Sequence, residues 1–248
     1  MNRRELLKTL GTAGTAGALA AAGWPELGAW RFPRRETGLG AVASDLEARL
    51  REAIARQKVP GASIALFKDG TLETAAAGVA NISSGVEMTT DTIMHIGSIT
   101  KVFNTTLMQL VDEGRIRLDA PVKTYLPDFR VADVEATEQI TVKMLVNHTS
   151  GIDGDLTRES GHDQERIVDA MGRIAAMGQI HQPGADVSYN NAGMVVAGYL
   201  VQYLTGKSWY DVVKERIFRP LGMNHAIVVP EDALLYRASV GHHLNPGG

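Results

Sequence analysis

The sequence predicts an α+β fold in which an antiparallel sheet is flanked by helices and accompanied by a mostly helical second lobe. Residues 62–81 contain two strand-like runs around Lys68-Asp69-Gly70, a turn sequence typical of a β-hairpin. Before and after this hairpin, apolar residues recur with the period of a helix rather than that of a strand. The expected order is therefore one helix, one hairpin, and then a series of helices and loops.

The first predicted helix precedes the hairpin and opens the domain, which we place at residues 44–248. Ser44 and Glu47 have the spacing of a capping box, in which each side chain accepts a hydrogen bond from a backbone N–H of the first turn. Apolar residues follow at helical spacing, and Pro60-Gly61 is placed to end the segment. The pattern predicts one amphipathic helix that leads into the hairpin.

Most of the chain after the hairpin is predicted to be helix and loop. Apolar residues from Val102 to Val111 recur with a helical period, and Gly114 is placed to end that helix. Residues 117–129 contain two prolines and are predicted to form an irregular surface segment. Further helices are expected from about Val142 and over residues 163–177, 192–206 and 208–222.

The first 22 residues have the features of a twin-arginine-type signal peptide. Arg3-Arg4 precede a moderately apolar stretch rich in small residues, with cleavage expected near Ala20 or Ala22. A membrane anchor is the alternative, but the uncharged stretch over residues 9–25 has 17 residues, fewer than the roughly 20 that span a bilayer. We therefore expect export to the periplasm or the extracellular space, with no stable membrane span after cleavage. Residues 23–43, rich in glycine and proline, are predicted to form a spacer.

The composition excludes several classes of function. The chain has no cysteine, so it forms no disulfide and has no thiol nucleophile or thiolate metal site. Its formal net charge of −3 gives no basic field for a polyphosphate backbone, so nucleic acid is not an expected partner. The seven histidines show no ligand spacing such as HExxH, and there is no glycine-rich phosphate loop. We expect neither a metal nor an organic cofactor.

The segment "HIGSITKVFN" contains a candidate nucleophile, Ser98, and a candidate partner, Lys101. A serine hydroxyl is a poor nucleophile at neutral pH, so an enzyme must supply a base and stabilise the developing oxyanion. If a helix begins at Ser98, the two side chains lie on one face, because residues three apart are neighbours on a helix. The spacing alone favours an ordinary helix start, since such pairs also arise by chance.

A second candidate group lies in "SYNNAG", where Tyr189 and Asn191 precede a predicted helix. A phenol beside a lysine can hold a proton in transit, and an amide can orient a substrate carbonyl. The alternative is that Tyr189 packs in the core and Asn191 caps the helix that follows. Together with Ser98 and Lys101, however, these residues would complete a site for acyl transfer.

Four segments, "GSITKVFN", "LVNHTSGI", "QPGADVSYNNAG" and "KERIFRPLGM", resemble in order and spacing the serine β-lactamase and penicillin-binding protein superfamily. The resemblance runs from about Ser44 to the end of the chain. It is strongest to the branch of class C β-lactamases, D-alanyl-D-alanine carboxypeptidases and related esterases, because a tyrosine motif stands where class A enzymes have SDN. It implies a β-lactamase/transpeptidase-like fold with Ser98 in a cleft between the sheet and the helical lobe.

The resemblance also implies a role for each candidate residue. Ser98 would be the acylated nucleophile, and Lys101 its proton acceptor or electrostatic partner. Tyr189 would be the general base and acid that serves the leaving group and the deacylating water. Asn191 would orient Lys101 and the substrate amide, and the backbone N–H of Ser98 would form one half of the oxyanion hole.

The segment "HTSG", residues 148–151, suggests a competing site, because it places a serine beside a histidine. No GxSxG elbow accompanies it, and the resemblance implies that the segment is a structural turn. We keep the Ser-His arrangement as the less favoured alternative.

The resemblance is incomplete toward the end of the chain. The family has a later strand with a lysine- or histidine-containing triad ending in glycine, which supplies the second oxyanion N–H, and no KTG or HxG occurs on a strand-like run after Tyr189. Later strands of the sheet are also missing from the predicted elements. We therefore expect a C-terminally truncated hydrolase. The alternative is a reduced relative whose missing part comes from a partner or is not needed.

The sequence thus predicts an exported serine acyl hydrolase that acts through a Ser98 acyl-enzyme on an amide or ester. The substrate would be a small molecule or peptide: a β-lactam, an ester or a D-amino-acid peptide. The competing hypothesis is a catalytically weak or inactive fragment that serves as a binding module for cell-wall peptide or a protein partner.

Overall fold

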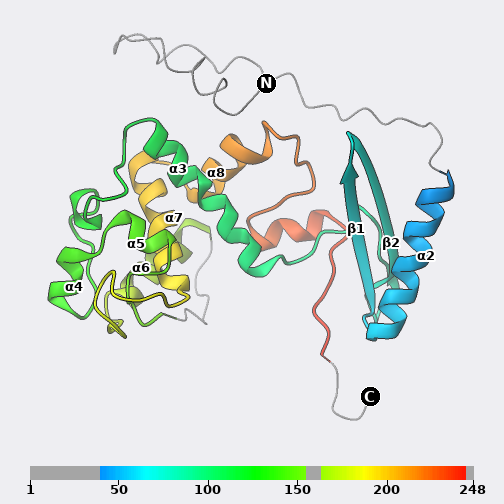
Figure 1. The fold of residues 1–248 in the computed structure, drawn as a ribbon, viewed down its shortest axis with the longest axis horizontal. Helices are drawn as coiled ribbons and strands as arrows, with labels where there is room; N and C mark the ends of the chain where they lie inside the picture. Colours follow the sequence, from blue (N-terminus) through cyan, green and yellow to red (C-terminus); the bar gives the residue numbers. More distant parts are fainter. Residues whose placement is uncertain (1–39, 155–162, 244–248) are drawn as a thin grey trace, which may run out of the picture. The chain divides into compact units, whose positions relative to one another are not determined.

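The computed structural model describes residues 40–154 and 163–243, all of which belong to one structural unit, Phe32–Gly248 (Figure 1). The predicted signal peptide, residues 1–22, lies outside the described residues, as does most of the predicted spacer. Within the described ranges, no helix is both long and apolar enough to cross a membrane. Helices and an antiparallel sheet are both present, so the predicted α+β fold is confirmed.

The predicted helix and hairpin are present as α2 (Gly40–Gln57), β1 (Gly61–Lys68) and β2 (Thr71–Asn81). The two strands pair antiparallel around Asp69-Gly70, which have φ angles of 51° and 79°. Two consecutive positive φ angles define the type I′ turn whose twist matches that of paired strands. Local turn chemistry therefore fixes the register of the hairpin, and α2 packs against β2 (Figure 1).

The predicted start of the first helix was wrong by four residues, because α2 begins at Gly40 and Ser44 lies inside it. Glu47, the expected capping-box partner, instead accepts hydrogen bonds from Arg51 one turn later, at 2.7 Å to Nη2. Alanine-rich sequence is a good helix former, and nothing in "GAVA" before Ser44 stops the helix. Glu47 therefore belongs to an intrahelical surface ion pair with Arg51 rather than to a capping box.

The sheet of the described chain has three strands in the order β1-β2-β3, where β3 is the short strand Val86–Glu87. A later segment also reaches this part of the chain. Ile93 forms a parallel bridge with Ala238, and the backbone N–H of Val240 donates to Ala80 O at 3.1 Å. These backbone contacts tie residues 237–240 to the region of the hairpin.

The remaining described elements are helical. They are η1 (Gly97–Asn104), α3 (Thr105–Asp112), η2 (Val122–Thr124), α4 (Val134–Gln139), α5 (Val142–Val146), α6 (Asp163–Ile174), α7 (Asn191–Thr205), α8 (Trp209–Val213), η3 (Lys214–Phe218) and η4 (Pro230–Leu235). The central one is α7, which contacts η1, α3, α5, α6 and α8 (Figure 1). Its side chains Val196, Leu200 and Val201 are fully buried. The main hydrophobic core therefore surrounds α7.

Residues 117–129 differ from their predicted surface role. Val122, Leu126 and Phe129 are buried and belong to the core around α7. Prolines interrupt regular helix, but they do not prevent apolar residues three or four apart from facing the same side of a turn. The segment is irregular in backbone, as predicted, but it contributes to the core.

Candidate active site

Ser98 and Lys101 lie on a 3-10 helix, η1, that runs into α3 after Asn104. The sequence predicted a helix here, and the 3-10 form improves the match, because three residues per turn place positions i and i+3 directly above one another. Lys101 Nζ donates to Ser98 Oγ at 3.1 Å. The side chain of Ser98 is exposed, so its hydroxyl is accessible to a substrate.

Tyr189 reaches the same hydroxyl from the loop that precedes α7. Its Oη lies 2.5 Å from Ser98 Oγ, although the two residues are 91 positions apart in sequence. Lys101 Nζ lies 4.6 Å from the centroid of the Tyr189 ring. A cation at that distance from an aromatic ring is attracted to it.

The sequence left two roles open for Asn191, partner of Lys101 or cap of the following helix. In the structure these roles belong to two neighbouring asparagines. Asn191 Oδ1 accepts a hydrogen bond from Lys101 Nζ at 2.7 Å. Asn190 is the N-cap of α7: its Oδ1 accepts from the backbone N–H of Gly193 at 2.6 Å, and its Nδ2 donates to Ile152 O. The predicted alternative, in which Asn191 caps the helix, is therefore wrong by one residue.

Asn190 is a site-supporting residue that the sequence analysis did not single out. Asparagine is a favoured N-cap residue at either position, so "NN" before a helix does not reveal which of the two is the cap. Gly193 also helps to place this helix start, because a Cβ there would lie 3.0 Å from Leu145 O in α5. The first turn of α7 can thus approach α5 closely.

The four predicted site residues form one connected chain of contacts: Tyr189 Oη, Ser98 Oγ, Lys101 Nζ and Asn191 Oδ1. A lysine ammonium has three donors, and two of them are used here on Ser98 and Asn191. The serine hydroxyl has a second polar partner in the phenol. Chemically, this arrangement can remove a proton from Ser98 and stabilise an anion that forms beside it.

The "HTSG" segment does not form the alternative Ser-His site. Ser150 is fully buried, so its hydroxyl cannot meet a substrate. His148 lies in the turn that follows α5 and has a φ of 64°, as expected for a structural turn. The same turn nevertheless brings the His148 ring to within 4.8 Å of the Tyr189 ring, centroid to centroid. The segment therefore borders the site without supplying its nucleophile.

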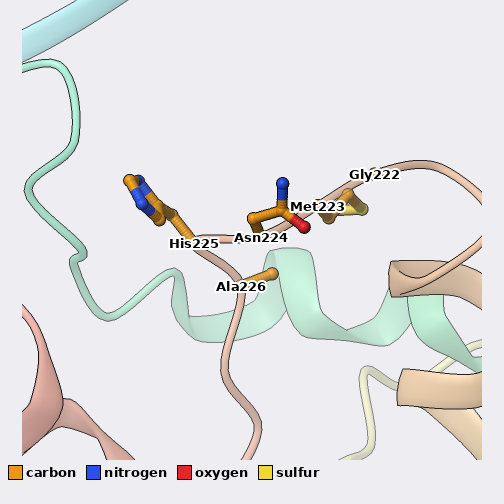
Figure 2. Close-up of a pocket in the computed structure, with 5 residues that line it drawn as sticks. All are labelled: Gly222, Met223, Asn224, His225 and Ala226. Atoms are coloured by element: carbon orange, nitrogen blue, oxygen red, sulfur yellow. The ribbon is translucent and has the colours of Figure 1, made fainter. Parts of the chain in front are cut away.

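A separate pocket of about 460 Å³ is lined by residues 222–226, drawn in Figure 2. These residues form one turn after η3, and the site residues Ser98, Lys101 and Tyr189 are not among them. His225 in this turn is exposed and lies 3.4 Å from a carboxylate oxygen of Asp91, as Nδ1 to Oδ1. Within the described residues, no group of three or more histidine, aspartate or glutamate side chains could hold a metal ion.

Comparison with known proteins places this geometry in a family. Residues 46–247 match the family model for Beta-lactamase. The chain belongs to the β-lactamase family. This match confirms the family resemblance that the four sequence motifs predicted. The likeness to solved structures confirms the predicted β-lactamase/transpeptidase-like fold.

Individual relatives of this β-lactamase-family chain are longer than it is. It is 42 % identical to Penicillin-binding protein 4 of Amycolatopsis lactamdurans over 185 aligned residues. The alignment covers 74 % of this chain and 49 % of the relative. A solved D-amino acid amidase from Ochrobactrum anthropi SV3 is 28 % identical, with a TM-score of 0.63 over 78 % of this chain and 56 % of that chain. A class C β-lactamase, 23 % identical, shares the fold with a TM-score of 0.68 over 85 % of this chain and 60 % of that chain. The chain spans about half the length, or less, of the curated relatives it matches.

Proposed function

We propose that this protein is a serine acyl hydrolase that forms an acyl-enzyme through Ser98. The observation that carries the proposal is that Ser98 Oγ lies within hydrogen-bond distance of both Tyr189 Oη and Lys101 Nζ. Membership in the β-lactamase family supports it, because the motifs of that family assign the nucleophile to the serine of SxxK. The backbone N–H of Ser98 is the proposed first oxyanion donor.

In the acylation step, Ser98 Oγ forms a bond to the carbonyl carbon of the substrate, and its proton passes to a Tyr189 phenolate. The Lys101 ammonium, 3.1 Å from Ser98 Oγ, favours both this phenolate and the negative charge of the tetrahedral intermediate. When the bond from carbon to the leaving nitrogen or oxygen breaks, Tyr189 returns its proton to the leaving atom. The products are an ester at Ser98 and a free amine or alcohol.

Deacylation uses the same groups in reverse. A water molecule gives a proton to the Tyr189 phenolate and attacks the acyl carbon, and collapse of the intermediate returns the proton to Ser98 Oγ. Asn191 holds Lys101 Nζ at 2.7 Å, so the ammonium keeps its position through both steps. No metal or organic cofactor takes part in this scheme.

The proposed substrate is an amide or ester, with a β-lactam, a simple ester and a D-amino-acid peptide as the three candidates. The structural likeness to a D-amino acid amidase supports an amide of a D-amino acid, and the relative named as a penicillin-binding protein supports a β-lactam. Hydrolysis of nitrocefin, p-nitrophenyl esters and D-phenylalanine amide by the same preparation would rank the three.

Covalent labelling tests the proposal directly. A fluorescent penicillin and a fluorophosphonate should each add their mass to the wild-type chain and not to Ser98→Ala. Ser84→Ala, at an exposed serine of the turn after β2, is the matched control and should be labelled like the wild type. A wild type that takes neither label contradicts the hydrolase proposal. If such a protein still binds a cell-wall peptide reversibly, the binding-module hypothesis replaces it.

We also propose that the chain is exported through its first 22 residues. The paired arginines Arg3 and Arg4 and the uncharged stretch after them support this. Replacement of both arginines by lysine should retain the protein in the cytoplasm, as measured by cell fractionation. Equal export of the two forms contradicts the twin-arginine route.

A further inference from the structure

One residue, His148, contacts three consecutive residues of the loop that carries Tyr189. Its carbonyl oxygen accepts from the backbone N–H of Ser188 at 2.9 Å. Its ring packs on the Tyr189 ring, with centroids 4.8 Å apart and planes tilted by 36°. Its Nδ1 accepts from the backbone N–H of Asn190 at 3.1 Å. Tyr189, which lies between these two backbone contacts, is the residue whose hydroxyl contacts Ser98.

We propose that His148 is a positioning residue that holds Tyr189 against Ser98, an inference that rests on the hydrolase function proposed above. Two hydrogen bonds fix the backbone on either side of Tyr189, and the ring contact fixes the aromatic plane between them. A tyrosine on an exposed loop otherwise has several rotamers, of which one places Oη at Ser98. The substrate and Ser98 do not touch His148 in this scheme.

The backbone of His148 supports this role. Its φ of 64° lies in the left-handed region, where an ordinary side chain is strained and glycine is not. Helices often end in this conformation, most commonly with glycine, and the backbone N–H of Thr149 donates to Met144 O to close the last turn of α5. Glycine would complete the same turn at lower cost. Strain of this kind tends to persist where the side chain has a function, and here the side chain is the part that meets Tyr189 and Asn190.

The contact with Asn190 requires neutral histidine. Because Nδ1 accepts a hydrogen bond, the ring proton is on Nε2. Burial lowers the pKa of His148, and the nearby Lys101 ammonium lowers it further, while the backbone of Asn190, the smallest of the three effects, raises it. Among the described residues, the charged and titratable side chains that act on this ring are Lys101 on η1 and Tyr189 on the loop before α7. A second proton would point an N–H at the N–H of Asn190 and add a cation beside Lys101, so acid should release Tyr189.

Two variants separate a positioning role from a structural turn. His148→Gly keeps the left-handed backbone without strain and removes the ring and the acceptor. His148→Asn also tolerates this backbone and places an amide oxygen where Nδ1 lies, but it does not titrate. Lys58→Asn, at another left-handed residue with a φ of 54°, is the control for the backbone change alone.

The kinetic result expected is a loss in kcat with little change in KM. For the substrate that the wild type hydrolyses, kcat should fall about 10-fold or more in His148→Gly, as for loss of a well-placed proton-transfer group. His148→Asn should retain part of kcat and lose the acid limb that His148 gives to the wild-type pH profile. Lys58→Asn should match the wild type. Equal kcat in His148→Gly and wild type, or an unchanged acid limb in His148→Asn, overturns the inference.

A second measurement does not depend on activity. In protein labelled with ¹³C on its tyrosine rings, the Tyr189 signal, assigned with Tyr189→Phe, should shift with pH as His148 titrates and should not do so in His148→Asn. A Tyr189 signal that shows the same pH dependence in both proteins contradicts the positioning role. If the wild type shows the coupled shift but takes no covalent label at Ser98, the hydrolase proposal fails and the His148 contact stands.

Discussion

The hairpin and the helical region around α7 use apolar side chains in different ways. Along α7, Leu200 is 0 % exposed, and Val196 and Ala197, one turn before it, are buried as well. In the hairpin, Ala75 and Ala77 are buried on one face of β2, but the cross-strand pair Phe67 and Leu72 on the other face is 58 % and 48 % exposed. Among the described residues, the main hydrophobic core cluster lies in the helical region and includes no residue of the hairpin.

This difference matters for the candidate active site, because two of its residues lie on helices that belong to, or contact, the buried region around α7. Asn191 is the first residue of α7, and Lys101 lies on η1, which contacts α7. Rigid, well-packed elements hold a site more precisely than loops do. We therefore expect substitutions around α7 to affect the geometry of the site and substitutions on the exposed face of the hairpin to leave it intact.

Removal of the Tyr189 hydroxyl should give the largest change. Tyr189→Phe keeps the ring contacts with Lys101 and His148 but removes the group 2.5 Å from Ser98 Oγ. We expect kcat/KM to fall by about 10²–10⁴, the usual contribution of a general acid-base group. Steady-state hydrolysis measures this, and Phe67→Ser on the hairpin is the control that should stay within about twofold of wild type. A comparable loss in Phe67→Ser would mean that the hairpin face also supports the site.

Truncation of a core leucine should give the next largest change, this time in stability. Leu200→Ala on α7 should lower the free energy of unfolding by about 2–5 kcal/mol, because it removes fully buried methyl groups and leaves a cavity. Leu66→Ala on β1, where the side chain is 46 % exposed, should cost about 1 kcal/mol or less. Urea unfolding followed by circular dichroism compares the two. Equal losses would show that the hairpin is packed as tightly as the helical core.

The two asparagines should separate stability from activity. Asn190→Ala removes the cap of α7 and the bond to Ile152 O, so we expect a loss of about 1–2 kcal/mol in the free energy of unfolding. Asn191→Ala leaves that cap in place and removes the acceptor of Lys101, so activity should fall while the unfolding midpoint changes little. If Asn191→Ala is the more destabilising variant, the assignment of cap and acceptor is reversed.

Features set by nearby residues were predictable from the sequence. The turn at Asp69-Gly70 follows from residues that tolerate positive φ, and the contact of Ser98 with Lys101 follows from a spacing of three. The partnership of these two with Tyr189 was predicted from the resemblance to a family rather than from spacing, because no local rule connects residues 91 positions apart.

Features that depend on tertiary packing were not predictable. Which of the two asparagines caps α7 depends on where the helix starts, and either would satisfy the local preference. The burial of Val122 and Phe129 depends on the core that α7 provides, since their own segment is broken by prolines. His148 was noted for the serine beside it, whereas its contact with the loop around Tyr189 joins two turns 42 residues apart.

The smallest predicted effect is a local loss of stability in acid, confined to the site. Because the pKa of His148 is lowered by burial and by Lys101, its neutral form stabilises the fold fully above the ordinary histidine pKa of about 6.5, and this contribution is lost as the pH falls below that value. Hydrogen-exchange protection of the Ser188 and Asn190 amides should therefore fall as the pH drops below about 6.5, after correction for the intrinsic exchange rate. The amides of β1 and β2, which contain no histidine, should keep their protection over the same range. If the amides of Ser188 and Asn190 and those of β1 and β2 lose protection together, acid opens the whole fold. The loop around Tyr189 is then no more sensitive to acid than the hairpin.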